Sequence, residues 1–417
     1  MIQLIRGFKD ILPKDLALWQ FIEKKAISLF SAFGYSEIRL PLLEKSALFA
    51  RGIGEGTDIV EKEMYSFEDR NEEWITLRPE ATAGMVRAYI QHKMYAQGDV
   101  KKLFTIGPMF RRERPQKGRY RQFYQISVET LGSDSPLLDA QMIYMPMRLL
   151  TELGVKEVSV HVNSLGCKAC RPAFTEKLKA FIRQEATELC SDCLRRTDVN
   201  PLRVLDCKVP ACREAMNGAP NILQSVCDEC RTHFQTVLDL LEQENIPFVI
   251  DPNLVRGLDY YTRTAFEIQT HLLGAQSAIA GGGRYDGLVS ALGGPDTPAI
   301  GFAFGLDRLV EVVAQYQPVS PEVPDIFIAA LGVKSQQKAF DWMCELVQNG
   351  FRAEMDVDSR SLKSQMKQAD RSNARFVLLV GEQELAQKEA TLRNMNNKEQ
   401  IQIPFENLVQ TLSTYIN

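Results

Sequence analysis

Residues 301–309 read Gly-Phe-Ala-Phe-Gly-Leu-Asp-Arg-Leu, and this segment says most about the fold. Small residues alternate with phenylalanines and are followed by an apolar helical pattern, which predicts a strand that leads into a helix at Leu306. The small residues would let a ligand approach the backbone closely. Arg308 lies where this helix opens, so the segment predicts a strand-to-helix junction that carries a binding site.

The chain before this junction alternates between helical and extended patterns. Near-helical apolar spacing predicts a helix from Pro13 to about Phe33, which Gly34 ends. We expect these further elements: a strand over 35–40 that stops at Pro41, a turn followed by a helix over 75–95, a long hairpin over 102–131 with its polar loop near 116–118, strands over 246–268, a glycine-rich turn at 281–283, and a helix through Leu288.

Two changes of composition suggest domain boundaries. Residues 166–245 contain eight of the nine cysteines and have a mostly helical pattern, which indicates an insertion. A proline-rich stretch at 317–324 is typical of a linker. Strand and helix patterns alternate beyond it, with strands expected at 326–330, near Ala353 and at 376–380. We therefore expect a core over 1–323, interrupted by the insertion, and an α/β domain over 324–417.

Composition and charge limit the possible classes of protein. The 417 residues suit two or three domains, and contents of 45% hydrophobic and 24% charged residues are ordinary for a globular enzyme. The N-terminus lacks an apolar run typical of a signal peptide, and no stretch approaches the roughly 20 apolar residues that span a bilayer. We therefore expect a cytoplasmic protein without a membrane partner.

A local basic run contrasts with the net charge of −4. Between residues 101 and 121, Glu113 is the single acid among eight basic side chains. Such a run is usually only a solvated face, but interleaved aromatic residues also suit phosphate and adenine binding. The basic residues are Lys101, Lys102, Arg111, Arg112, Arg114, Lys117, Arg119 and Arg121.

Three segments in this order resemble the motifs of the class II aminoacyl-tRNA synthetases. Residues 34–41 resemble the first motif, which implies a homodimer interface; residues 110–113 (Phe-Arg-Arg-Glu) resemble the second and residues 301–309 the third. The resemblance implies an α+β catalytic core, in which helices flank an antiparallel sheet. It also implies that ATP is bound with Mg²⁺ as a substrate.

Two longer segments narrow the resemblance to the histidyl-tRNA synthetase family, in a bacterial form with a cysteine-rich insertion. They are residues 254–261 (Leu-Val-Arg-Gly-Leu-Asp-Tyr-Tyr) and 280–288 (Ala-Gly-Gly-Gly-Arg-Tyr-Asp-Gly-Leu). The resemblance implies activation of L-histidine by ATP to histidyl-adenylate, followed by transfer to the 3′-terminal adenosine of histidine tRNA. Residues 324–417 resemble an anticodon-binding domain, with a generic supporting module as the alternative; the basic, hydroxyl-rich helix start at 359–367 suits RNA phosphates.

The same resemblance implies a histidine-binding set. Glu80 and Thr82 would hold the ammonium, and Gln125 the polar backbone end of the substrate. Glu129 and Tyr261 would read the two imidazole nitrogens, of which one donates and the other accepts a hydrogen bond. Alternatively, Glu80 only stabilises a helix N-terminus, and one of the two neighbouring tyrosines only packs. The complete set is Glu80, Thr82, Gln125, Glu129, Tyr260, Tyr261 and Tyr285.

Arginines would form the nucleotide side of the site. Arginine suits the charge that develops on the α-phosphate, because its planar fork meets two oxygens. By resemblance, Arg111 and Arg256 would act at the α-phosphate, and Arg308 at the γ-phosphate and adenine. A salt bridge from Arg308 to Asp307 or Glu311 is the structural alternative. The expected catalytic residues are Arg256, Arg111 and Arg308, and the ATP-binding residues Arg111, Glu113, Arg119 and Arg308.

Eight cysteines in the insertion form four close pairs, and a two-residue spacing lets two thiolates face one ion. We expect one or two structural Zn²⁺ sites, with small buried residues that bind no metal as the alternative. His233 is the only histidine near the pairs. The cysteines are Cys167, Cys170, Cys190, Cys193, Cys207, Cys212, Cys227 and Cys230.

Two rival assignments remain. One is the regulatory subunit of ATP phosphoribosyltransferase, a histidine-sensing relative that typically lacks the C-terminal domain and has eroded Arg256. The other is a class II synthetase for another amino acid, which would make the match at 254–261 a coincidence.

Overall fold

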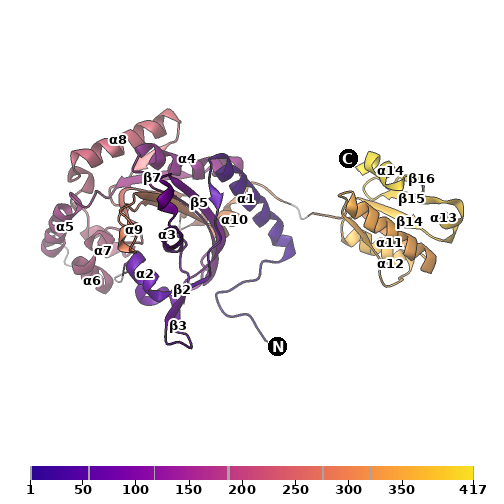
Figure 1. Cartoon of the computed structure of the whole chain (residues 1–417), viewed down its shortest axis with the longest axis horizontal. Helices are drawn as coiled ribbons and strands as arrows, with labels where there is room; N and C mark the ends of the chain where they lie inside the picture. Colours follow the sequence, from indigo (N-terminus) through magenta and orange to yellow (C-terminus); the bar gives the residue numbers. More distant parts are fainter. Residues whose placement is uncertain are drawn as a thin grey trace. The chain divides into compact units, whose positions relative to one another are not determined.

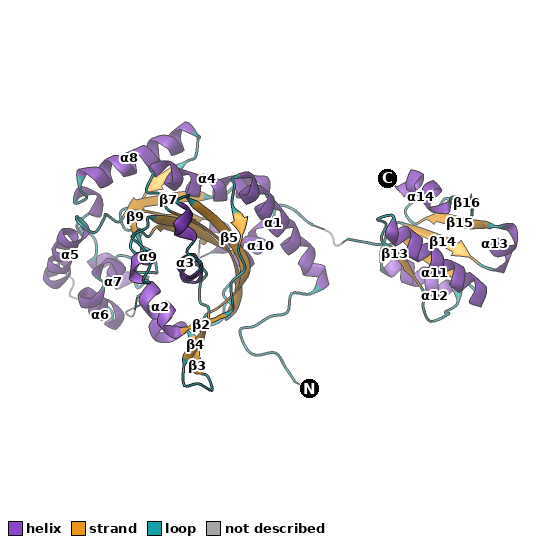
Figure 2. Cartoon of the chain, viewed as in Figure 1, coloured by secondary structure: helices purple, strands orange, loops and turns teal. Residues whose placement is uncertain are grey.

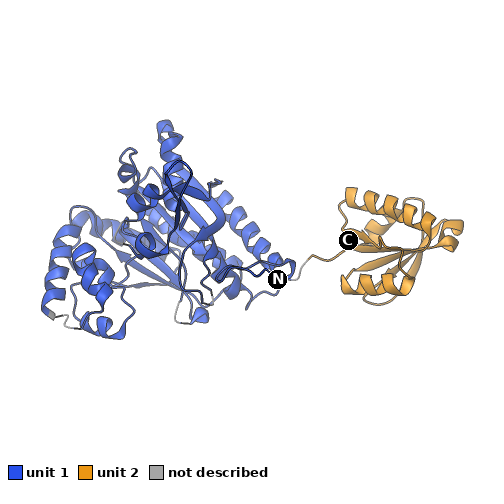
Figure 3. Cartoon of the chain, turned by 90° about the horizontal axis from the view of Figure 1, so that it is seen from below, with its two compact units in different colours: residues 1–319 blue, residues 320–417 orange. Residues whose placement is uncertain are grey.

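The computed structural model describes residues 2–54, 57–116, 118–185, 188–274, 277–319 and 322–416. The chain forms two compact units, residues 1–319 and 320–417, coloured separately in Figure 3. The division between them falls within the proline-rich stretch at 317–324. No helix in the described ranges is long and apolar enough to cross a membrane.

The first unit is built on a sheet of eight strands in the order β1-β5-β6-β11-β10-β9-β7-β8 (Figures 1 and 2). The outer pairs β1–β5 and β7–β8 are parallel, and the strands between them pair antiparallel. The strands are β1 (Ser36–Glu37), β5 (Lys101–Phe110), β6 (Gln122–Leu131), β7 (Ser159–Ser164), β8 (Phe248–Ile250), β9 (Thr262–Gln269), β10 (Ala278–Arg284) and β11 (Ala299–Gly305).

One face of this sheet is covered by helices and holds the main apolar core. Because side chains alternate along a strand, Ile126 and Val128 of β6 belong to this core, whereas Gln125, Ser127 and Glu129 point to the other face and line a cavity. The core is closed by α1 (Pro13–Ala32), α4 (Pro136–Glu152), α8 (Asp228–Gln243) and α10 (Leu306–Val313). The alternation of β6 thus separates the core from the polar face.

Smaller elements border the polar face. These are α2 (Ser46–Ile53), the π-helix η1 (Ile59–Glu63), α3 (Thr82–Gln91), η2 (Met94–Gln97), η5 (His271–Leu273), α9 (Leu288–Ala291) and the sheet β2-β4-β3, formed by β2 (Leu43–Lys45), β3 (Tyr65–Glu68) and β4 (Trp74–Leu77). Side chains of α3 and α9 pack together in a separate apolar cluster with Tyr285.

The insertion between β7 and β8 is helical, as expected (Figure 2). It comprises α5 (Arg171–Glu185), α6 (Ser191–Val199), η3 (Pro201–Val204), α7 (Pro210–Ala215), η4 (Ile222–Gln224) and α8. Four of its cysteines are buried in an apolar cluster that also includes Val255, Tyr261 and Ala265 of the core.

The second unit has the expected alternation of strands and helices. Strands at 326–330, near Ala353 and at 376–380 are confirmed, and an antiparallel extension was not anticipated. The sheet order is β13-β12-β14-β15-β16. The elements are β12 (Ile326–Ala330), α11 (Val333–Gln348), β13 (Ala353–Met355), α12 (Leu362–Arg371), β14 (Phe376–Val380), α13 (Glu382–Gln387), β15 (Glu389–Asn394), β16 (Gln400–Pro404) and α14 (Leu408–Ile416).

The glycine-rich turn expected at 281–283 is wrong, because these residues lie inside strand β10. A Cβ on Gly281 would overlap the Arg256 guanidinium, and one on Gly282 would overlap the carbonyl of Gly301. The glycines are therefore explained by crowded neighbours and not by a change of chain direction. The following helix begins at Leu288, where we expected it to end.

Three other boundaries also differ from expectation. Residues 74–77 form strand β4 where a turn was expected, and the strand expected over 35–40 is only Ser36–Glu37. The stretch 246–268 is not extended throughout, because residues 251–261 form an irregular segment between β8 and β9. The helical insertion and the mainly antiparallel core nevertheless agree with the expected α+β architecture.

Candidate active site

A polar cavity lies over β6, β10 and β11 in the first unit. Of the residues predicted to bind substrates, Tyr285 is absent from its lining and the others border it. The predicted residues in the lining are Glu80, Thr82, Arg111, Glu113, Arg119, Gln125, Glu129, Arg256, Tyr260, Tyr261 and Arg308. The fold therefore gathers segments from positions 80 to 308 around one cavity.

Glu80 precedes helix α3 and is 4% exposed. Its carboxylate oxygens accept backbone hydrogen bonds from Thr82 (2.6 Å) and Ala83 (3.0 Å). The structural alternative, an acid at a helix N-terminus, thus describes its contacts. The carboxylate also borders the cavity, so the helix start fixes an acid where an ammonium ion could reach it.

Glu129 is the second buried acid, 2% exposed, and lies on the polar face of β6. Its two oxygens accept hydrogen bonds from the Thr82 hydroxyl and the Tyr285 hydroxyl, both at 2.6 Å. Burial raises the pKa of Glu129 to about 8, although both hydroxyl groups favour the charged form. Tyr285 therefore does not line the cavity itself but donates a hydrogen bond to Glu129, which does.

Glycines leave room for these charged groups. Gly301 of β11 is directly opposite Glu129 of β6, and a Cβ there would overlap the Glu129 carboxylate. Gly281 of β10 leaves room for the guanidinium of Arg256 in the same way. Gly301 of the third motif and Gly281 of the segment 280–288 thus accommodate protein side chains.

Besides Asp307 Oδ1, which pairs with Lys9, three buried polar atoms on the described lining have no hydrogen-bond partner. They are Oε1 of Gln125, Oγ of Ser127 and Nε of Arg256. A buried polar atom without a partner is costly, so these atoms mark places where a polar ligand would bind. Ser127 was not predicted as a lining residue, although strand alternation places it between Gln125 and Glu129 on one face.

Arg111 and Arg119 lie at opposite ends of the loop of the long hairpin. The Nε of Arg111 donates to the carbonyl of Pro79 (2.9 Å), and its guanidinium lies 5.3 Å from the centre of the Phe123 ring. Arg119 pairs with Glu113 at 2.7 Å. Of the other basic residues in this run, Arg112 and Arg114 are exposed and Lys117 lies outside the described residues.

Arg308 donates to two backbone carbonyls, those of Gly118 (3.2 Å) and Ala278 (2.7 Å). Asp307 instead accepts from the backbone of Tyr124 and pairs with Lys9 at 2.6 Å. Burial, followed by the nearby charge of Arg119, lowers the pKa of Arg308. Positive charge is therefore concentrated at this end of the cavity, where an anion would relieve the repulsion.

Arg256 comes from the irregular segment 251–261 and pairs with Glu267 of β9 at 2.6 Å. Its guanidinium also lies 5.9 Å from the centre of the Tyr261 ring. Glu267 was not expected from the sequence, since its strand position lacks a distinguishing local signal. It holds Arg256 at the boundary between the cavity and a second hollow lined by the insertion.

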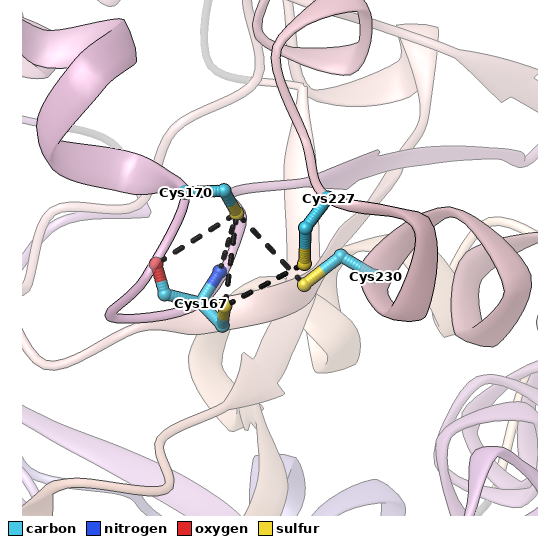
Figure 4. Close-up of side chains that lie close together, drawn as sticks. All are labelled: Cys167, Cys170, Cys227 and Cys230. Atoms are coloured by element: carbon cyan, nitrogen blue, oxygen red, sulfur yellow. Dashed lines mark hydrogen bonds between the residues drawn. The ribbon is translucent and has the colours of Figure 1, made fainter.

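The eight cysteines of the insertion form two groups of four. Cys167, Cys170, Cys227 and Cys230 make one group (Figure 4), and the remaining four make the other. Within each group all sulfur atoms lie within 4.8 Å of one another. The Nε2 of His233 donates to the carboxylate of Asp139 at 2.8 Å, and His233 belongs to neither group. The second group is Cys190, Cys193, Cys207 and Cys212.

A mainly antiparallel sheet that brings arginines from a hairpin and a strand-to-helix junction to one cavity defines a class II aminoacyl-tRNA synthetase. Sequence comparison gives the family within this class. The family described as histidyl-tRNA synthetase matches residues 7–309, and the anticodon binding domain matches residues 325–415. The chain belongs to the histidyl-tRNA synthetase family.

Individual relatives agree with this assignment. The chain is 56% identical to the histidine–tRNA ligase of Desulfatibacillum aliphaticivorans over 100% of both chains. It is 57% identical to that of Desulfosudis oleivorans, covering 100% of this chain and 99% of the relative. The crystal structure of the apo histidyl-tRNA synthetase of S. aureus superposes with a TM-score of 0.84 at 36% identity, covering 99% of this chain and 100% of the other.

Proposed function

We propose that the cavity over β6, β10 and β11 is where this chain, a histidine–tRNA ligase, performs both steps of its reaction. L-Histidine and ATP would react to give histidyl-adenylate and pyrophosphate. The terminal adenosine hydroxyl of histidine tRNA would then attack the acyl carbon and release AMP. The single observation that supports this location best is the set of three unpartnered buried polar atoms beside two buried acids.

The acid end of the cavity would bind histidine. Glu80 has a fixed carboxylate for the ammonium group, and Thr82 lies beside it at the start of α3. Gln125 presents an unpartnered amide oxygen to the polar end of the substrate. These groups would orient the substrate carboxylate before the reaction, which lowers the entropic part of the barrier.

The imidazole would lie between Glu129 and the tyrosines 260 and 261. Glu129 is held by Thr82 and Tyr285, and Tyr260 packs against Tyr285 at a ring distance of 5.5 Å. An acid on one nitrogen and a phenol on the other would read both ends of the ring. An analogue lacking either nitrogen would leave a buried polar group unpaired and would be rejected strongly.

The arginine end would bind ATP. Arg111 and Arg256 would stabilise charge on the α-phosphate, and Arg308 would contact the outer phosphates and adenine. Glu113 holds Arg119 in place at the same end of the cavity. Magnesium, carried by the nucleotide, would neutralise the outer phosphate groups when bound. The side chains of this protein would thus promote the reaction by positioning the substrates and by stabilising the charge of the transition state.

Further partners follow from the same function. The second unit would contact the anticodon, and its helix α12 carries basic residues Lys363 and Lys367 near its start. The first-motif segment at 34–41 supports a homodimer. Because histidine tRNA is used in protein synthesis, we place the enzyme in the cytoplasm. Structural Zn²⁺ would occupy the cysteine groups of the insertion.

Amino-acid-dependent ATP–pyrophosphate exchange tests this function. Histidine, proline, threonine and glycine would be compared with purified wild type, Arg256→Ala and the surface control Arg148→Ala, whose side chain pairs with Glu152 on helix α4. We expect exchange with histidine alone, reduced about 10²-fold or more by Arg256→Ala and unchanged by the control. Histidine binding without exchange would instead favour the regulatory role of the ATP phosphoribosyltransferase subunit.

A further inference from the structure

The two cysteine groups of the insertion are nested along the chain. The first and last close pairs, Cys167/Cys170 and Cys227/Cys230, form the outer group. The two middle pairs, from Cys190 to Cys212, form the inner group. Sequence spacing left open whether there are one or two sites and which pairs combine; the fold brings the cysteines into two separate groups and shows which pairs lie together.

The sulfur separations fit one ion at the centre of each group. Tetrahedral zinc with Zn–S bonds of about 2.3 Å places its sulfur ligands about 3.8 Å apart. In the outer group the Sγ of Cys167 lies 3.7 Å from that of Cys170 and 3.8 Å from that of Cys227 (Figure 4). In the inner group the Sγ atoms of Cys190 and Cys207 are 3.9 Å apart. Separations this short leave room for one ion and not for a polynuclear cluster.

Backbone groups support sulfur ligands in both groups. The N–H of Cys167 donates to the Sγ of Cys170 (3.2 Å), and the N–H of Cys190 donates to the Sγ of Cys212 (3.1 Å). Donors aimed at sulfur favour the thiolate, the form that binds metal. Gly166 has φ = +68°, and a Cβ there would lie 2.9 Å from the Sγ of Cys170, so its small size accommodates the outer group.

The outer group joins the two ends of the insertion. Cys167 and Cys170 lie between β7 and α5, and Cys227 precedes α8, which holds Cys230. The adjacent Arg171 donates to the carbonyl of Tyr261 at 2.7 Å. An ion here would close the chain between residues 167 and 230 at the edge of the catalytic sheet.

The inner group encloses the segment that contacts the Arg256 loop. Between Cys193 and Cys207, the side chain of Asn200 donates to Asp259 (2.6 Å), and that of Arg203 donates to the carbonyl of Gly257 (2.8 Å). Helix α6 also pairs with the core through Arg196 and Asp58, the residue before η1, at 2.5 Å. Both sides of the cysteine-flanked segment therefore contact the core close to the active site.

We propose that the insertion binds two separate zinc ions, each held by four cysteines, and that the inner ion positions the loop that carries Arg256. The outer ion fixes the ends of the insertion to the sheet. The inner ion holds Asn200 and Arg203 against residues 257 and 259. The number of ions is independent of the catalytic assignment, whereas the positioning role rests on the function proposed for Arg256.

Metal analysis of the full-length protein tests the two sites. We expect about two zinc ions per chain in wild type, and about one in each of the pairs Cys227→Ser/Cys230→Ser and Cys190→Ser/Cys193→Ser. Cys344 lies in the second unit outside both groups, so Cys344→Ser is the matched control and retains both ions. Cobalt titration of metal-depleted wild type gives a second readout that needs no variant: the bands of tetrahedral cobalt thiolate grow until two equivalents are bound.

A folded wild-type protein with normal stability and no bound metal would overturn the proposal. So would loss of both ions from either variant pair alone, disulfides in place of free thiols, cobalt bands that stop at one equivalent, or iron in place of zinc in protein from zinc-supplemented cells.

Coupling between the inner ion and Arg256 tests positioning. The Cys190→Ser/Cys193→Ser pair should lower histidine-dependent exchange about 10-fold in wild type and less than about 2-fold in the Arg256→Ala background, because residues acting through one another are not additive. An equal loss of exchange activity in both backgrounds would show that the inner ion only stabilises the fold, and would overturn its proposed role in positioning Arg256. Metal counting remains valid even if the chain catalyses no exchange.

Discussion

The catalytic sheet and the cysteine-rich insertion bury reactive side chains in different ways. Beside the sheet, Glu80 and Glu129 are nearly inaccessible, yet their oxygens accept hydrogen bonds from Thr82, Ala83 and Tyr285. In the insertion, the sulfur atoms of four buried and four half-buried cysteines lie close together within each group of four. The acids of the polar site are therefore held by protein donors, whereas the insertion gathers four thiol groups into each cluster.

This difference explains where each region is vulnerable. The polar site depends on space, because Gly281 of β10 leaves room for Arg256 and Gly301 of β11 leaves room for Glu129. The insertion has an apolar cluster in which cysteines take places usually filled by larger side chains. Cysteine buries little apolar area, so a metal would supply stability that the small core lacks.

The largest loss of activity is expected from Gly301→Ala, which disturbs the packing between β11 and β6. The added methyl group would overlap the Glu129 carboxylate and displace it from the imidazole site. We expect histidine-dependent exchange to fall about 10³-fold or more, since a misplaced polar partner rejects its ligand strongly. Circular dichroism checks that the sheet persists. Gly52→Ala in helix α2 is the control, because its added Cβ would meet its nearest neighbours at 3.4 Å or more; comparable activity of the two variants would refute the packing argument.

A pH-dependent effect is expected at Glu129. Its pKa is about 8 in the folded chain against an ordinary 4.5, so between these values the folded state binds more protons than the unfolded state. Stability contributed by this group therefore falls as pH rises from 4.5 to 8 and is constant above that. At 1.36 kcal/mol per pKa unit, this group can change the free energy of unfolding by at most a few kcal/mol over that pH range.

Thermal unfolding of wild type and Glu129→Gln from pH 5 to 9 measures this contribution. The amide does not ionise, so the variant should gain in Tm relative to wild type as pH rises. Glu44→Gln is a control at a partly exposed carboxylate that pairs with Arg87 on the other side of α3. A difference between wild type and Glu129→Gln that does not depend on pH would contradict the buried, protonated state.

An intermediate effect is expected from Gly166→Ala in the insertion. The residue has φ = +68°, and the added Cβ would press on the Sγ of Cys170. Backbone strain and the displaced sulfur should together lower the free energy of unfolding by about 1–3 kcal/mol and weaken the binding of the proposed outer ion. Zinc release to a chromophoric chelator measures this, and it should be faster for one of the two ions. Gly218→Ala has a similar φ of +87° with no neighbour within 4 Å, so it separates strain from contact with sulfur.

The smallest effect is expected from Ser127→Ala, which removes an unpartnered hydroxyl on the cavity wall. If this hydroxyl binds a substrate, its loss should raise KM for histidine or ATP about 3- to 10-fold, equivalent to one ordinary hydrogen bond. The unfolding temperature should hold or rise, because a buried unpaired polar atom is removed. Ser66→Ala, on the small sheet, is a control whose hydroxyl bonds Thr76. Unchanged KM values would remove Ser127 from the substrate site.

Much of the fold could be read from local patterns. The helix beginning at Pro13, the hairpin around residue 116 and the strands of the second unit follow from apolar periodicity and proline or glycine signals. The errors arose where distant neighbours decide conformation. Residues 281–283 resemble a turn locally, but Arg256, Thr264 and Gly301 occupy the space that side chains would need, so the chain continues as a strand.

The sequence by itself identified the family and the residue types on which the proposed site rests: two acids, several arginines and four close pairs of cysteines. These features depend on residue identity and spacing, so they can be recognised before the fold is known. Tertiary structure alone decided that Tyr285 donates a hydrogen bond to Glu129, that Glu267 pairs with Arg256, and that the first and last cysteine pairs lie together. Each of these depends on strand pairing and loop closure between residues far apart in the chain, which local sequence does not specify.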